Sequence, residues 1–70
     1  MIDKDKALEI ARENAQKFYR DLSIYTVTAE LMDDQWHVHY ILKDKNLDGG
    51  GPHYVISALT GEIIEMRLEQ

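Results

Sequence analysis

The sequence predicts an α+β domain in which one N-terminal amphipathic helix packs on a four-stranded antiparallel meander sheet. Three observations carry this prediction. Apolar side chains recur every three or four residues as far as Leu22, they alternate with polar ones after Ser23, and turn-forming residues separate four alternating runs. We expect residues 1–70 to form a single domain, because so short a chain builds only one core.

The helix is expected over residues 4–21. Its apolar or small side chains follow three-and-four spacing and fall on one stripe, which consists of Leu8, Ala11, Ala15, Phe18 and Leu22. Asp3 is the expected N-cap, because its carboxylate can accept hydrogen bonds from the free amides of the first turn. The stripe is the surface that the helix presents to the sheet.

Four strands are expected after the helix. Residues 25–31 and 36–42 alternate on either side of the sequence DDQ and therefore form a hairpin. Residues 54–58 and 63–68 flank the sequence ALTGE, where Thr60 and Gly61 form a short turn and Gly61 takes a positive φ. Consecutive hairpins of this kind give a meander.

The two faces of this sheet are expected to differ, because one helix covers only one of them. The expected core, facing the helix, is Tyr25, Val27, Leu31, Trp36, Val38, Tyr40, Leu42, Tyr54, Ile56, Ile64, Met66 and Leu68. The opposite face is expected to show Thr26, Thr28, Glu30, His37, His39, Ile41, Val55, Ser57, Ile63, Glu65 and Arg67. A surface this apolar usually meets a partner, and we expect the contacts to include His37, His39, Ile41, His53, Val55 and Ile63.

Composition narrows the classes of function. Thirteen acidic and eight basic side chains give a net charge of −5, which argues against nucleic-acid binding because phosphate contacts need clustered Lys and Arg. The chain has no cysteine, so neither disulfides nor a thiolate metal site supplement its small core. The charged N-terminus does not resemble a signal peptide and no window is apolar enough to span a bilayer, so we expect a cytoplasmic protein without membrane contact.

The sequence DKNLDG begins like a calcium loop. Asp44, Asn46 and Asp48 match the first three ligand positions and Gly49 the glycine position, but the twelfth position holds Val55 instead of a bidentate glutamate. Strands also replace the helices that would flank such a loop. We therefore interpret the segment as a strand connection in which Gly49, Gly50, Gly51 and Pro52 form a loop motif.

Three histidines are the remaining candidates for a ligand site. His37 and His39 share a strand face, and His53 lies near them if the second and third strands pair. Three imidazoles suit zinc, but no second-shell carboxylate can be placed beside them, so we expect a partner-binding surface and neither a metal nor a cofactor. Binding of a small ligand or a metal through this histidine face is kept as an alternative.

Catalysis finds no support in the sequence. Ser23 and Ser57 lie in no motif with a base, there is no cysteine nucleophile, and one helix on a small sheet offers little concavity for paired carboxylates. We expect a protein that is not an enzyme.

The segment WHVHYILKDKNLDGGGPHYVISALTGEIIEMRLE resembles the small nuclear-transport-factor-like immunity domains of bacterial polymorphic-toxin systems. The matching residues are Trp36, Gly50, Gly51, Pro52, Tyr54, Ile56, Thr60, Gly61, Glu62 and Ile64. PepSY-like domains are similar in the hairpin around TGEI, and both families often have Asp where this chain has Ser57. The fold implied by the resemblance is PepSY-like or a reduced cystatin-like arrangement.

The resemblance implies a non-enzymatic bacterial protein that binds and neutralises a cognate toxin in the cytoplasm. The PepSY-like alternative implies a module that inhibits or regulates a peptidase. Because four strands leave two unpaired edges, a homodimer formed through a sheet edge is compatible with the toxin-binding, the peptidase-binding and the ligand-binding hypotheses alike.

Overall fold

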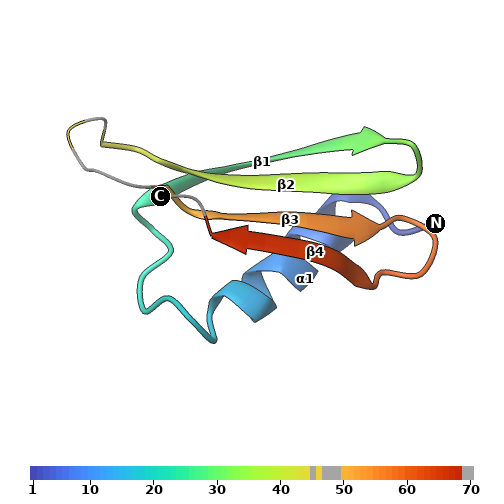
Figure 1. The fold of residues 1–70 in the computed structure, drawn as a ribbon, viewed down its shortest axis with the longest axis horizontal. Helices are drawn as coiled ribbons and strands as arrows, with labels where there is room; N and C mark the ends of the chain where they lie inside the picture. The colour runs from blue at the N-terminus through green and yellow to red at the C-terminus, as the bar shows by residue number, and fades with distance from the viewer. Residues whose placement is uncertain (45, 47–49, 69–70) are drawn as a thin grey trace.

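The computed structural model describes residues 1–44, 46 and 50–68 of the chain. Its elements are α1 (Lys4–Ala15), β1 (Tyr25–Met32), β2 (Gln35–Leu42), β3 (Pro52–Ser57) and β4 (Ile63–Leu68). The strands form one antiparallel sheet in the order β1-β2-β3-β4, and α1 lies against one face of it (Figure 1). The predicted α+β fold with a meander sheet is confirmed.

The helix begins where the sequence predicts and ends earlier. Asp3 caps it, accepting a hydrogen bond at Oδ1 from the Lys6 amide at 2.8 Å. After Ala15 the turn tightens, because the Lys17 amide donates to the Asn14 carbonyl at 3.1 Å and the Phe18 amide to the Ala15 carbonyl at 3.0 Å. The expected continuation to residue 21 is therefore wrong.

This early end changes which aromatic residue reaches the core. Phe18, which the helical stripe placed against the sheet, is 65% exposed. Tyr19 packs against the core instead, and its ring meets that of Tyr25 edge to face, with centroids 6.1 Å apart.

The core lies under the two central strands. Its buried residues are Ala11, Ala15, Val38, Tyr40, Tyr54 and Ile56, so the helix contributes small side chains and the sheet contributes large ones. The Tyr54 side chain reaches from β3 through the core to α1, where its hydroxyl donates to Asn14 Oδ1 at 2.9 Å. Trp36 is half-buried and donates from Nε1 to the Ile2 carbonyl at 3.1 Å, which ties the N-terminal segment to β2.

The two edge strands are covered less than the sequence predicts. Val27 and Leu31 of β1 are 39% and 46% exposed, and Leu68 of β4 is also exposed. Their place on the helix side of the sheet follows from the register, which sets Val27 opposite Tyr40 and Leu31 opposite Trp36. Assigning these edge residues to a closed core was therefore wrong, since the buried cluster is confined to α1, β2 and β3.

A β-bulge corrects the side-chain assignment in β4. Val55 pairs with Glu65 but Ile56 pairs with Ile63, so Ile64 is the extra residue. Ile63 consequently packs against the helix-side core, whereas Ile64 is exposed. The expectation that Ile63 belongs to the opposite face and Ile64 to the core was wrong for this reason.

Candidate functional site

The sheet face opposite α1 carries two rows of side chains that run across the strands. One row consists of Glu30, His37, Val55 and Glu65, and the next consists of Thr28, His39, His53 and Arg67. Thr26 and Ile41 begin a third row. These residues define what we call the open face.

The open face brings the three histidines together. The rings of His39 and His53, which are opposite each other in the register of β2 and β3, have centroids 4.0 Å apart. The centroids of His37 and His53 are 6.2 Å apart. All three side chains are half-buried, so they form a compact imidazole cluster in the middle of the sheet rather than three solvated groups.

Apolar and charged residues border this cluster. Val55 is only 8% exposed although the described helix, α1, lies on the other face, and Ile41 is 55% exposed. Arg67 Nε lies 3.5 Å from Glu65 Oε2, an exposed ion pair of little energetic weight. The open face therefore offers a partner a half-buried centre with an exposed apolar side chain and a few charges at its rim.

The predicted partner-binding residues thus fall into two groups. His37, His39, Ile41, His53 and Val55 lie together on the open face, and Ile63 lies on the other side of the sheet. The clustering of the first five follows directly from the register of two central strands.

The histidine cluster is not arranged as a metal centre. Among the residues that the structure describes, no group of three or more His, Cys, Asp or Glu side chains is placed to hold a metal ion. The candidate ion loop lies partly outside the described residues, at Lys45 and at Leu47, Asp48 and Gly49. Within its described part, the Asn46 amide donates to Asp44 Oδ1 at 2.9 Å, as in an Asx turn.

Gly51 and Pro52 of the loop motif and the TGE turn have structural roles at the two ends of β3. Gly51 and Pro52 are buried where β3 begins. At the other end of β3, Gly61 has a φ of +80° and donates its amide to the Ser57 carbonyl at 2.8 Å. The Ser57 hydroxyl accepts from the amides of Leu59 and Thr60, both at 3.2 Å, which is the role an Asp side chain fills in such turns.

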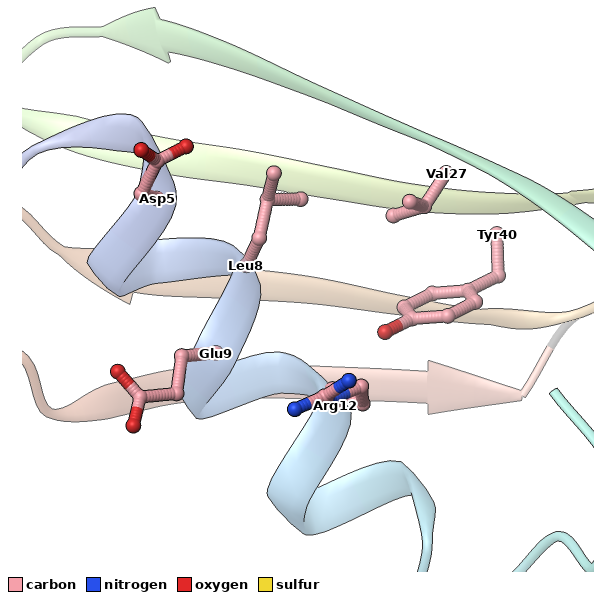
Figure 2. A pocket seen from close by; sticks show the side chains of 6 residues that line it. All are labelled: Asp5, Leu8, Glu9, Arg12, Val27 and Tyr40. Atoms are coloured by element: carbon pink, nitrogen blue, oxygen red, sulfur yellow. The ribbon is translucent and has the colours of Figure 1, made fainter.

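A pocket that the sequence did not predict lies between α1 and the β1–β2 hairpin. It has a volume of about 240 Å³ and is lined by Asp5, Leu8, Glu9, Arg12, Val27 and Tyr40. Figure 2 shows Leu8 and Tyr40 projecting into this space, with Arg12 beside it on the helix. Its helical residues recur at intervals of three or four, a spacing that places them on one flank of the apolar stripe and could have indicated the pocket.

The pocket has an apolar floor and a charged rim. Burial raises the pKa of the Tyr40 hydroxyl, while the nearby Arg12 guanidinium opposes this rise. The side chains of Asp5, Glu9 and Arg12 belong to exposed residues, so water reaches the rim. The arrangement suits a shallow apolar contact better than chemistry, because catalytic carboxylates need a site that limits water.

Comparison with protein-family models, with curated proteins and with solved structures gives no match for this chain. In the described part of the chain, no helix has the length and apolar character needed to cross a membrane. Function is therefore inferred from the surfaces themselves.

Proposed function

We propose that this chain is a non-enzymatic protein-binding module of the immunity type, which binds and neutralises a cognate toxin through the open face. The observation that carries the proposal is a sheet face that no other described element covers, with a cluster of half-buried histidines beside Val55 and Ile41. Half-buried rings are already restricted and lose little conformational entropy on binding, while the exposed Ile41 side chain gains from burial in an apolar contact. Such surfaces act as contact sites between proteins.

One feature of the sequence supports a toxin as the partner, and a second favours a partner with a basic surface. The resemblance of the C-terminal half to immunity domains of polymorphic-toxin systems implies this activity and a cytoplasmic location. The net charge of −5 favours association with a basic partner surface, because long-range attraction raises the rate of encounter.

The first test of the proposal is the identity of the neighbouring gene. A neighbouring gene for a large secreted protein with a variable C-terminal toxin domain supports it, and a neighbouring peptidase gene favours the PepSY-like alternative instead. The purified toxin domain is then titrated with this protein by calorimetry, and its toxicity is measured with and without the protein expressed in the same cells.

Single substitutions test whether the toxin domain contacts the open face. Ile41→Asp places a charge on the open face and should weaken binding of the toxin domain at least about tenfold, because a carboxylate would be desolvated in an apolar contact. Leu59→Asp is the matched control, since Leu59 is an exposed apolar residue in the turn between β3 and β4. A toxin domain that does not bind, or that binds Ile41→Asp and the unmodified chain equally well, contradicts the proposal.

A further inference from the structure

β1 is an edge strand without the usual protection against pairing. Among the described strands it has a neighbour only on the β2 side, its eight residues pair with β2 without a bulge, and its sequence YTVTAELM has one charge and no Pro, Gly or Lys. Natural edge strands are normally short, bulged or charged, because unpaired backbone amides and carbonyls otherwise recruit another strand. β1 is neither short nor bulged, and Glu30 is its single charge.

The opposite edge makes the contrast clear. β4 has six residues, contains a bulge beside Ile64, and carries Glu65 and Arg67 next to one another on the open face. These are the features that discourage pairing of edges. The difference between the two edges indicates that β1, and not β4, is the strand available to a partner.

The exposed side chains of β1 have a pattern that complements itself. Val27 and Leu31 lie on the helix side, 39% and 46% exposed, with the small Ala29 midway between them. In an antiparallel pair of identical strands centred on Ala29, each Val27 stands directly opposite a Leu31. On the open-face side, Glu30 stands opposite Thr28, so no like charges meet.

We propose that β1 pairs with β1 of a second copy of this chain, antiparallel and about a two-fold axis at Ala29, to form a continuous eight-stranded sheet. The contact is isologous, so it closes as a dimer and does not propagate into a fibre. It supplies backbone partners along β1 and places two Val–Leu pairs on the helix side. This inference is independent of the proposed toxin binding.

Two further observations favour a second copy as the occupant of this edge. Val27 lines the pocket beside α1, so Leu31 of the second copy would extend the apolar floor formed by Leu8, Val27 and Tyr40. A chain of 70 residues also has a small core, and chains of this size commonly gain stability by association. The register centred on Ala29 is the one that sets Val27 opposite Leu31, whereas centring the pair on Glu30 would place two glutamates opposite each other.

The first test measures the oligomeric state by sedimentation velocity across a range of concentrations. We expect a dimer that dissociates on dilution, and we expect Leu31→Lys to raise its dissociation constant at least about tenfold. Ile64→Lys is the matched control, because Ile64 is an exposed apolar residue on the opposite edge strand. A chain that stays monomeric up to about 1 mM, or a dimer weakened equally by both substitutions, overturns the proposal.

The second test fixes the register by cross-linking. The chain has no cysteine, so any disulfide formed by a single-cysteine variant joins the introduced residue of one copy to that of another. Under mild oxidation Ala29→Cys should form a disulfide-linked dimer, since residues directly opposite in an antiparallel pair have Cα atoms about 4.5–5.5 Å apart. Thr26→Cys should not, because its copies would be about 20 Å apart along the strands. Equal cross-linking of the two variants, or none at Ala29→Cys, overturns the proposed pairing.

Discussion

Gly51 shows how a single residue fixes the entry to the central strands. Its amide donates to the Tyr40 carbonyl at 3.2 Å, and a Cβ at this position would lie 2.6 Å from Tyr40 Cβ and 2.9 Å from Tyr25 Cε1. No side chain fits such a gap, so β2 and the start of β3 approach this closely only because residue 51 is glycine. This gives a packing reason for a glycine that the sequence marks only as part of a motif.

Substituting Gly51 should therefore destabilise the fold. We expect Gly51→Ala to lower the free energy of unfolding by about 1–3 kcal/mol, because the added methyl group meets backbone and ring atoms in a packed region. Chemical denaturation measures the change, with Leu59→Ala as a surface control expected within about 0.5 kcal/mol of the unmodified chain. A Gly51→Ala variant as stable as that control would show that the two strands can separate without cost.

Tyr54 should make the folded protein less stable at alkaline pH. Burial raises the pKa of its hydroxyl from 10.0 to about 12, with smaller contributions from Tyr40 and Tyr19. Between these two values the unfolded chain releases the proton and the folded chain keeps it, so stability is full below pH 10 and falls as the pH rises towards 12.

Tyr54→Phe isolates this effect. The variant loses the hydrogen bond to Asn14 and should be about 1 kcal/mol less stable at neutral pH, but it should lose less further stability between pH 10 and 12. Thermal unfolding at a series of pH values measures both differences. The same alkaline slope in the two proteins would contradict a buried, neutral Tyr54.

The β1–β2 hairpin shows a conflict between sequence and backbone at the level of an element. Its two turn residues, Asp33 and Asp34, have φ values of 51° and 59°, a conformation in which most side chains crowd the backbone. The two-residue turn matches the twist of the strands, and glycine is the residue preferred there. The turn is thus formed at some cost, which the pairing on either side offsets.

This conflict predicts that the turn can be improved. Asp34→Gly should raise the free energy of unfolding by about 1 kcal/mol, because glycine adopts positive φ without crowding. Asp34→Val removes the same carboxylate but should be destabilising, since a branched side chain tolerates positive φ poorly. Denaturation of the pair separates backbone strain from charge, and equal stability of the two variants would contradict the explanation.

The helix and strands also show what the periodicity of apolar residues predicts and what it misses. The strands were predictable because polar and apolar residues alternate from Tyr25 to Leu42, and the register then placed His39 opposite His53. The end of the helix was not, because it depends on tight turns after Ala15 that leave the apolar spacing unchanged. The bulge was also hidden, since adjacent isoleucines at 63 and 64 fit either face equally well.

For the whole molecule, the sequence predicted the open face but neither the pocket nor the exposed edge of β1. The open face follows from alternation alone, so five of the six expected contact residues do lie on it. The pocket beside α1 depends on how far the helix extends over β1, and the exposure of Val27 and Leu31 depends on the same relation. Sequence patterns indicate which side of an element is apolar, but not how much of that side its neighbour covers.

The two proposed surfaces occupy different parts of the molecule and should be separable. The toxin contact uses the open face, whereas the dimer uses the edge of β1 and the side chains beside the helix. Leu31→Lys should therefore give a monomer that binds the toxin domain with unchanged affinity per chain. Ile41→Asp should give a dimer that no longer binds it.

Sedimentation and calorimetry on the same two variants test this separation. Because contacts on different elements usually contribute additively, the doubly substituted chain should combine both losses without a further loss of fold, which circular dichroism checks. If Leu31→Lys weakened toxin binding as strongly as Ile41→Asp, the toxin would instead recognise the β1 edge or the dimer. If Ile41→Asp dissociated the dimer, the open face itself would be the contact between copies.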